Sequence, residues 1–492
     1  MNQPYRIESF IGGDYIAGAG EAFTLIDPSN EAEIASYREA GEALARQAHE
    51  AAQKGGAAWR KLSASARGAI LFELGRLVRR DAEILAQAES HIAGKPIRDC
   101  RAEVAKVADM FTYYAGWADK IEGRVVPVPT SHLNVVEREP LGTIVQMTPW
   151  NAPIFTAGWQ IAPALAAGNA VILKPSEWTP VTSVMLAALA REAGVPAGAL
   201  NVLVGGARTG AALVDNPLCG KAVFIGSVAT GRKVAALAGS AGRPALLELG
   251  GKSANVIFAD CDLARAVKAA QGAIFAAAGQ SCTAGSRLLV ERSVHDIVVN
   301  ALKDAASRLR VGLPRDDATE IGPLHSARQF ERISGMIGRA REAGAALVAG
   351  GARPGGLSSG YFLAPTILAD AKPGMEIFDK EIFGPVLAVT PFDHEDEAIA
   401  LANAGEFDLA GAVWSGQGTR AIRVARALRA GSVWINGYRT LSVQSPFGGM
   451  RGSGFGRSSG HDVLLEYTQP KSIWIETDDH APIAFGYDVL KQ

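Results

Sequence analysis

Apolar residues recur at two different spacings along this chain, and the change of spacing marks out its elements. Between Glu42 and Ile121 they follow the 3.6-residue period of a helix, with Ser63 placed as a helix cap. The side chains expected on one face of the capped helix are Ile70, Leu71, Leu74, Leu77 and Val78. We therefore predict helices in this segment, followed by short β-strands over residues 123–139.

From Thr143 onward, short apolar runs alternate with segments of helical pattern, which is typical of a parallel sheet covered by helices on both faces. The strands predicted before residue 250 are Thr143–Met147, Ala170–Leu173, Leu200–Val204, Ala222–Ile225 and Ala245–Leu247. The strands predicted after residue 252 are Asn255–Phe258, Arg287–Val290, Val386–Val389, Gly411–Trp414 and Ser432–Ile435. The break near residue 250 predicts an α/β protein with two doubly wound parallel-sheet domains.

One stretch, from Leu141 to Leu173, contains no charged residue and is long enough to span a bilayer. It also contains Pro149, Pro153 and Pro163, which would break or destabilise a membrane helix. We therefore predict a buried strand-loop-helix-strand segment here and no association with a membrane.

The composition narrows the class of protein further. The chain has 492 residues, 48% of them hydrophobic and 20% charged, which is the composition of a globular protein with more than one core. The formal net charge of −1 gives no electrostatic reason to expect nucleic acid or an anionic membrane as a partner. The N-terminal residues show no apolar signal-peptide region, so a cytoplasmic location is expected.

The four cysteines are Cys100, Cys219, Cys261 and Cys282. None forms a CxxC pair and no Cys/His cluster has zinc-like spacing, so no metal site is predicted. Four cysteines could in principle form two disulfides. A chain of this size does not need them, and we favour reduced thiols.

Two residues are candidates for covalent chemistry. Cys282 stands among small residues in FAAAGQSCTAGSR, where a substrate could approach its sulfur, although a cysteine is more often a small buried hydrophobe. Glu248 ends an apolar run in LELGGKS, 34 residues upstream. It is a candidate general base that activates water, with a solvated strand end as the alternative.

Asn151, in a PWN motif after a predicted strand, could donate its amide to a developing oxyanion, or could be an ordinary turn residue. Glu381 and Phe383 stand two residues apart, so in an extended segment their side chains point to the same side. The alternative for this pair is a strand end before a proline turn.

Two motifs predict nucleotide contacts at strand ends. Lys174 and Glu177, in LKPSE, could bracket a ribose at the edge of an open α/β sheet, or could belong to a charged loop. Gly226 and Ser227 lead from a strand into a helix whose N-terminus suits a pyrophosphate. No GxGxxG motif is present, so an ordinary Rossmann fingerprint is absent.

Each motif is modest alone, but PWN, LKPSE, FIGS, ELGGK, GQSC, EIFGP and SPFGG follow one another in the order found in aldehyde dehydrogenases. From about residue 10 to 475 the chain resembles that superfamily. The resemblance implies a cofactor-binding domain (1–120 and 140–250), a catalytic domain (251–469) and an oligomerisation element (121–139 and 470–492). In the last of these, a hairpin is expected to pair with a strand at about 470–476.

The resemblance also assigns roles. Cys282 would form a thiohemiacetal and then a thioester with the substrate, Glu248 would activate the deacylating water, and Asn151 would complete the oxyanion hole. The residues implied for the cofactor are Thr148, Trp150, Lys174, Ser176, Glu177, Gly205, Phe224, Gly226, Ser227, Leu249, Glu381 and Phe383. Those implied for the substrate pocket are Ala152, Thr156, Trp159, Ser281, Thr283, Arg439, Leu441 and Phe447.

The cofactor implied is NAD, because Glu177 would bind a free ribose diol and repel a 2′-phosphate; side-chain rotation leaves NADP as an alternative. Glu248 favours hydrolysis of the thioester over transfer to coenzyme A. The small Ala152 and Thr156 beside an aromatic wall suggest a bulky or aromatic aldehyde. Arg439 suggests instead a semialdehyde bearing a carboxylate, or a surface ion pair.

The assembly expected from the resemblance is a homodimer or homotetramer. Two competing functions stay open at this point: a coenzyme A-acylating dehydrogenase and a non-catalytic protein that kept the fold. Glu248 opposes the first. The joint presence of Cys282, Glu248 and Asn151 opposes the second.

Overall fold

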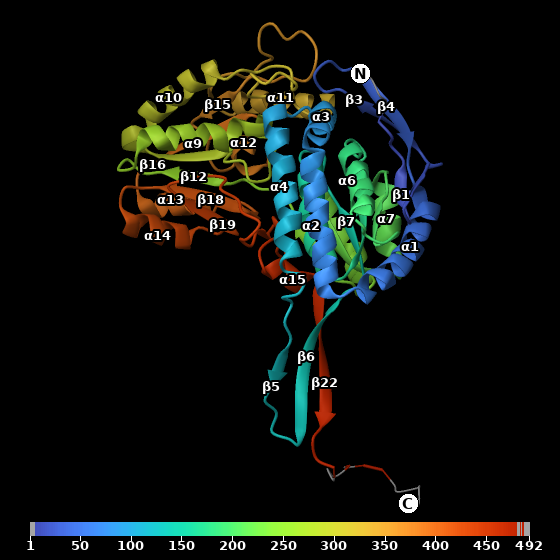
Figure 1. Cartoon of the computed structure of the whole chain (residues 1–492). Coiled ribbons are helices and arrows are strands. Elements are labelled where there is room, and N and C mark those ends of the chain that lie inside the picture. Colours follow the sequence, from blue (N-terminus) through green and yellow to red (C-terminus); the bar gives the residue numbers. More distant parts are fainter. Residues whose placement is uncertain (1–4, 480–482, 484, 487–492) are drawn as a thin grey trace, which may run out of the picture.

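A computed structural model describes residues 5–479, 483, 485 and 486, and Figure 1 shows two α/β bodies side by side with a narrow β-sheet projecting from them. The first body is built on an eight-stranded sheet, in the order β2-β1-β9-β8-β7-β10-β11-β21. Its central strands run parallel, as predicted. The bounds are β1 (Ser9–Ile11), β2 (Asp14–Ile16), β7 (Thr143–Met147), β8 (Ala170–Lys174), β9 (Leu200–Val202), β10 (Cys219–Ile225), β11 (Ala245–Glu248) and β21 (Gly454–Phe455).

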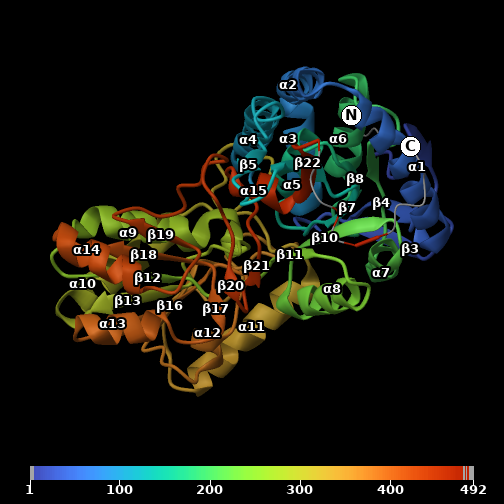
Figure 2. The same ribbon diagram turned by 90° about the horizontal axis from the view of Figure 1, so that it is seen from below.

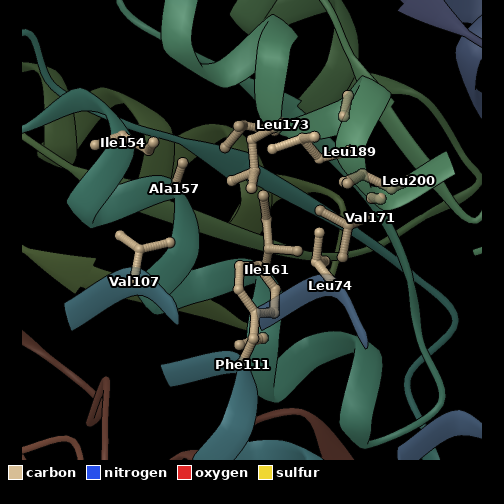
Figure 3. Close-up of a cluster of buried hydrophobic side chains, with 14 of the residues drawn as sticks. Leu74, Val107, Phe111, Ile154, Ala157, Ile161, Val171, Leu173, Leu189 and Leu200 are labelled. Carbon is tan, nitrogen blue, oxygen red and sulfur yellow. The ribbon is translucent and has the colours of Figure 1, made fainter. Parts of the chain in front are cut away.

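Helices cover both faces of this sheet, so each face buries its apolar side chains in a separate cluster. The helices are α1 (Gly41–Lys61), α2 (Ala64–Arg80), α3 (Ala82–Ala93), α4 (Ile97–Ala115), α5 (Pro153–Ala166), α6 (Val181–Glu192), α7 (Ala207–Asp215) and α8 (Val228–Ser240). In Figure 3, Phe111 of α4 and Ile161 of α5 pack toward Val171 and Leu173 of β8.

The predicted cap of α2 is confirmed. The Ser63 hydroxyl accepts a hydrogen bond from the Ala66 N–H at 3.2 Å, which satisfies one free N–H of the first turn. Leu71, Leu74, Leu77 and Val78 are buried as expected from the helical period. Ile70 is only partly buried, at the edge of the same cluster.

The charge-free stretch forms β7, α5 and β8, which confirms the strand-loop-helix-strand prediction. Its helix, Pro153–Ala166, has 14 residues, too few to cross a bilayer. Across the described part of the chain, no helix combines the length and the apolar character that a membrane span requires.

The second body is built on a seven-stranded sheet in the order β14-β15-β16-β13-β12-β18-β19, parallel except for β14. Its strands are β12 (Ala254–Ile257), β13 (Arg287–Glu291), β14 (Ala346–Ala349), β15 (Thr366–Ala369), β16 (Val386–Phe392), β18 (Ala410–Trp414) and β19 (Ser432–Ile435). Its helices are α9 (Leu263–Phe275), α10 (His295–Arg308), α11 (Ala327–Glu342), α12 (Glu376–Asp379), α13 (Glu395–Ala402) and α14 (Gly418–Ala427). Strands β14 and β15 were not predicted from the apolar pattern.

The projecting sheet contains β5 (Arg124–Val126), β6 (His132–Pro140) and β22 (Thr468–Glu476). Strand β22 pairs antiparallel with β6 along its whole length, from Thr468 opposite Pro140 to Glu476 opposite His132. This confirms the predicted pairing of the hairpin with a late strand. The segment from residue 480 onward lies largely outside the described residues.

Short elements connect the parts: β3 (Ala22–Ile26) with β4 (Glu33–Arg38), β17 (Phe407–Asp408) with β20 (Met450–Arg451), α15 (Asp462–Glu466) and two 3₁₀ turns (Ala276–Gly279 and Arg292–Val294). Seen from below, β20 and β21 lie where the two bodies meet (Figure 2). Strand β21 pairs with β11, so a segment of residues 251–469 completes the first sheet. This contact joins the bodies at the end of the strand that carries Glu248.

Candidate active site

A cavity of about 490 Å³ lies between the two bodies and brings most of the predicted site residues together. The predicted residues that line it are Trp150, Asn151, Ala152, Thr156, Trp159, Gly226, Ser227, Glu248, Leu249, Ser281, Cys282, Thr283, Glu381, Phe383, Arg439, Leu441 and Phe447. We call this cavity the chamber. The predicted residues outside its lining are Thr148, Lys174, Ser176, Glu177, Gly205 and Phe224.

Cys282 reaches the chamber through an unusual turn. The 3₁₀ segment Ala276–Gly279 follows α9, and Ala277 and Ala278 both have positive φ, at 52° and 53°. Gly279 has φ +67°, and a Cβ there would lie 2.0 Å from the Gly384 carbonyl oxygen. The small residues of this motif therefore allow the loop to pack against the 384–385 turn and present the thiol.

The thiol of Cys282 is strongly disfavoured as a thiolate. Burial, then the nearby carboxylates of Glu248 and Glu381, raise its pKa to about 12, against a weaker opposing effect of Arg439. At neutral pH the sulfur therefore carries its proton, and a nucleophilic role requires a group that accepts this proton.

Glu248 ends β11, opposite Ile225 of β10. Its Oε1 accepts a hydrogen bond of 2.6 Å from the hydroxyl of Ser458, and both side chains are buried. Its Oε2 is buried with no hydrogen-bond partner among the described residues. Burial raises the pKa of Glu248 to about 8, against the lowering effect of the Ser458 hydrogen bond. A carboxyl group of this kind can exchange protons near neutral pH.

Asn151 lies on the opposite wall, just before α5. Its side-chain Nδ2 donates a 2.8 Å hydrogen bond to the Gln280 carbonyl oxygen, two residues before Cys282. Gln280 is itself fixed, because its Oε1 accepts the His325 N–H at 2.9 Å. The amide of Asn151 is therefore held beside the cysteine loop, as an oxyanion donor would need to be.

Aromatic rings and a carboxylate close the neighbouring part of the chamber. Trp150 stacks on His325, with ring centroids 4.7 Å apart, and contacts Phe383 edge-on at 5.3 Å. Glu381 Oε1 accepts the Gly251 N–H at 3.0 Å, and burial raises its pKa to about 7. This wall offers a flat apolar surface next to a hydrogen-bond acceptor, which suits a nicotinamide ring and its ribose.

The residues predicted to bind the adenosine half lie beyond the chamber, at the carboxyl ends of β7, β8 and β9. Lys174 donates hydrogen bonds of 2.9 Å to the carbonyl oxygens of Pro175 and Gly205, and its Nζ lies 3.8 Å from Glu177. The Thr148 N–H donates to the Lys174 carbonyl oxygen, whereas the buried Thr148 hydroxyl lacks a partner among the described residues. Ser176 is buried in the same loop.

Between these two halves lies the start of α8. Ser227 caps this 13-residue helix by accepting the Thr230 N–H, and Gly226 donates its N–H to the Glu248 carbonyl oxygen at 3.0 Å. A Cβ at Gly226 would lie 2.7 Å from the ring of Phe224. Leu249 packs under the helix, within 2.4 Å of where a Cβ at Gly231 would lie. The free N–H groups of the first turn are suited to an anion.

These observations fit a dinucleotide. Outside the chamber are an orphaned hydroxyl at Thr148 and a buried cation beside a partly exposed carboxylate, and in its lining are a capped helix N-terminus and an aromatic wall. These features suit a ribose, a pyrophosphate and a nicotinamide. The chemistry of the donor set therefore agrees with the predicted cofactor.

The other side of Cys282 is the predicted substrate side. Trp159 and Phe447 stack obliquely with centroids 5.1 Å apart, and Thr156 bonds back to the Ala152 carbonyl oxygen at 2.8 Å. Arg439 lies at this end, with Nη2 3.4 Å from the Ser281 hydroxyl, and Leu441 completes the lining. Beyond it a second, wider cavity of about 950 Å³ opens, which shares Trp159, Leu441 and Phe447 with the chamber.

Several lining residues were not predicted. Phe155 contacts Trp159 edge-on at 4.9 Å, and the i, i+4 spacing on one helix could have indicated it. Lys95, Glu103 and Lys106 enter the chamber from α4 and the turn before it, and Ser458 approaches from near the C-terminus. No local sequence signal marks these four, because tertiary packing alone brings them to the cavity.

Comparisons with known proteins agree with this geometry. The family model described as "Aldehyde dehydrogenase family" matches residues 15–473. Betaine aldehyde dehydrogenase of Bacillus subtilis (strain 168) is 42% identical, over 95% of this chain and 97% of that protein. The NAD-dependent aldehyde dehydrogenase of Sinorhizobium meliloti superposes with a TM-score of 0.95 at 35% identity, covering 98% of this chain and 97% of that one.

A third similar protein is indole-3-acetaldehyde dehydrogenase, solved in complex with NAD+, with a TM-score of 0.94 and 38% identity. The superposition covers 96% of this chain and 97% of that structure. The chain belongs to the aldehyde dehydrogenase family. The roles of the individual residues remain predictions.

Proposed function

We propose that this protein oxidises an aldehyde to the carboxylic acid with NAD as the oxidant, through a covalent adduct on Cys282 that is finally hydrolysed. The observation that carries the proposal is the presence of two groups in one chamber. A thiol and a buried carboxyl group lie there together, and one oxygen of that carboxyl, Glu248 Oε2, has no partner among the described residues. That oxygen keeps an unused hydrogen-bond acceptor, which a water attacking the thioester would need.

In the first half of the reaction, the sulfur of Cys282 attacks the carbonyl carbon. Its pKa of about 12 means that the thiol must pass its proton to water or another base as it attacks, and this step does not need Glu248, whose role lies in the second half. The Asn151 amide then donates to the oxygen of the thiohemiacetal as charge develops there. A bound NAD would supply the hydride acceptor, and loss of the hydride would convert the adduct on Cys282 to a thioester.

In the second half, Glu248 removes a proton from water as the water attacks the thioester carbon. The raised pKa of about 8 makes Glu248 a stronger base than an ordinary carboxylate. Ser458 holds its Oε1, so Oε2 faces the reaction. The acid product leaves, and Cys282 regains its proton.

We propose NAD over NADP because Glu177 stands where the adenosine ribose is expected, 3.8 Å from Lys174. A carboxylate accepts from a free diol and repels a phosphate. The similar Sinorhizobium meliloti enzyme, which is named as NAD-dependent, supports this choice.

For the substrate we propose a bulky aldehyde with a monocyclic or bicyclic aromatic group. The chamber and the wider cavity share an aromatic boundary of Trp159 and Phe447, and Ala152 leaves room beside it. The relative named for indole-3-acetaldehyde supports an aromatic substrate. The relative named for betaine aldehyde would suggest a cationic one. We do not propose that substrate, because Lys106 and Arg439 place positive charge in the lining.

We further propose that the protein assembles as a homodimer or homotetramer through the projecting sheet, and that it works in the cytoplasm. Trp474 on β22 and Val125 on β5 are 56% and 64% exposed, which is a large apolar exposure for a free surface. The four cysteines are free thiols, in keeping with a reducing compartment.

The test follows NADH formation by absorbance with benzaldehyde-type and medium aliphatic aldehydes. NAD and NADP are compared, and coenzyme A is added or omitted. We expect turnover with NAD and no dependence on coenzyme A. A requirement for coenzyme A, or turnover that survives removal of the Cys282 thiol, would contradict the proposal.

A further inference from the structure

The substrate end of the chamber carries two positive side chains that form no ion pair with an acid of the described chain. Arg439 and Lys106 both line the cavity. Among the described residues, neither has a nitrogen within 4.0 Å of a carboxylate oxygen. The other lysine at this wall does have a partner, because Lys95 is ion-paired with Glu103.

The acids around this end offset that charge only in part, and Asp99 acts on Arg439 electrostatically without an ion pair. Glu103 is engaged by Lys95, and Asp99, at the start of α4, lies 3.4 Å from Arg98. Glu248 and Glu381 also line the chamber, and burial raises their pKa values to about 8 and 7. Near neutral pH these two carboxyl groups are therefore only partly ionised, and they offset the charges of Arg439 and Lys106 incompletely.

Arg439 is held in place by the backbone as well as by hydrogen bonds. Its φ of +58° lies in the left-handed region, which is uncommon for a residue with a long side chain. Its Nη1 donates to the Gly272 carbonyl oxygen at 3.3 Å and its Nη2 to the Ser281 hydroxyl at 3.4 Å. A guanidinium has five N–H donors, so these two long bonds leave donors free to face the chamber.

We propose that Arg439 binds a carboxylate of the substrate, so that the preferred aldehydes carry an anion a few bonds from the aldehyde group. The inference rests on the proposed function and names its substrate class. Ser281, which Arg439 contacts, is the residue next to Cys282, so an aldehyde carbon at the sulfur and a carboxylate at the guanidinium belong to one small molecule. Lys106 adds a second positive charge to the lining.

A different role for Arg439 would be structural: its hydrogen bonds to Gly272 of α9 and to Ser281 could hold the loop that carries Cys282 in place. A tie of that kind would affect all aldehydes alike, because it would act through the position of Cys282. Recognition of a carboxylate affects only the aldehydes that carry one. Matched pairs of substrates therefore separate the two roles.

The experiment measures KM and kcat for two pairs, 4-carboxybenzaldehyde against benzaldehyde and 4-oxobutanoate against butanal. The proteins are the full-length enzyme, Arg439→Gln and the control Arg426→Gln, which removes an exposed arginine of α14 outside the chamber. We expect the unaltered enzyme to prefer the carboxylate member of at least one pair. Arg439→Gln should raise KM for that member by about 10- to 100-fold, as for loss of a charged hydrogen bond, and leave its neutral partner within about twofold.

The inference is overturned if the enzyme shows no preference for the anionic member of either pair. An equal loss on both members in Arg439→Gln would also overturn it, in favour of the structural tie. If no aldehyde is oxidised at all, the proposed function has failed. A binding experiment with benzoate then tests separately whether Arg439 binds a carboxylate. Benzoate should then slow the alkylation of Cys282 by iodoacetamide in the unaltered protein and not in Arg439→Gln; equal rates with and without benzoate would remove the site.

Discussion

The chamber and the projecting sheet differ in how far one chain completes them. In the chamber, residues of the same chain hold two of the predicted catalytic side chains: Ser458 donates to Glu248, and the Gln280 carbonyl oxygen accepts from Asn151. The projecting sheet has the order β22-β6-β5, so β22 is an edge strand. Among the described residues, no strand pairs with its outer N–H and C=O groups. Its exposed Trp474 adds apolar surface to that edge. One chain therefore supplies the whole lining of the chamber, whereas the proposed assembly would cover the open edge of the sheet.

The largest expected effect is on the chemical side of this comparison. Cys282→Ala removes the nucleophile and should lower kcat by at least about 1,000-fold, because no other described thiol lines the chamber. The oligomeric state should not change, since the residue lies outside the projecting sheet. NADH formation and light scattering on the same preparation check both statements.

Cys261→Ala is the matched control. Cys261 is also a partly buried free thiol, but it lies outside the chamber. Its activity should stay within about twofold of the unaltered enzyme. Comparable loss in the two variants would show that cysteine removal acts through the fold.

The next effect concerns Glu248 and separates the two halves of the reaction. Glu248→Gln keeps the shape of the side chain and removes the base, so we expect kcat to fall by about 100- to 10,000-fold. The first half does not need this base, so rapid mixing should still show a burst of NADH. If Glu248→Gln has the same kcat as the unaltered enzyme, Glu248 does not have this role.

The pH dependence gives a smaller and more specific effect. The base must be ionised, and its pKa is about 8, so kcat should rise as pH increases through about 8 and then level off. The Ser458 hydrogen bond lowers that pKa. Ser458→Ala should therefore shift the rising limb to higher pH and lower kcat a few-fold at pH 7, with recovery at high pH.

Ser459→Ala is the control for that shift. Ser459 follows Ser458 and is also buried, but its hydroxyl donates to the Ser445 carbonyl oxygen and not to Glu248. Its pH profile should match that of the unaltered enzyme. If both serine variants shift the limb equally, the hydrogen bond to Glu248 is not the cause.

The smallest effect on chemistry is expected at the projecting sheet. Trp474→Lys places a charge on the exposed edge strand, and we expect a smaller assembly by light scattering with a kcat changed by less than about threefold. Ile297→Lys, on the exposed side of α10, is the matched control and should leave the assembly intact. An unchanged mass for Trp474→Lys would argue that the sheet is not the interface.

Much of this fold could be predicted from the sequence, because the parallel strands are continuous apolar runs between helical patterns. All ten predicted strands occur with bounds close to those expected, as for β7 (Thr143–Met147). Strands β14, β15 and the two-residue β21 were not predicted. Strand β14 is a partly exposed edge strand, and β21 is too brief to show an apolar run and exists only because it pairs with β11. Strand β15 (Thr366–Ala369) is buried between β14 and β16, and its short apolar run could have indicated it.

The site divides in the same way. Cys282, Glu248 and Asn151 stand in ordered motifs, and their meeting in one chamber could be expected from the order of those motifs. Ser458 and Lys106 could not be predicted, because each comes from a distant element and has no motif of its own. A local motif does not show which segments from distant parts of the chain lie close together in the folded protein, because tertiary packing decides this.

The most direct test of the central claim is to trap the covalent adduct. The Glu248→Gln protein is mixed with NAD and an aldehyde that the unaltered enzyme oxidises, quenched in acid, digested and analysed by mass spectrometry. We predict that the peptide containing Cys282 gains the mass of the acyl group, and that Cys100, Cys219 and Cys261 do not. Turnover by the unaltered enzyme without any adduct on Cys282 in the variant, or an adduct on another cysteine, would contradict the account.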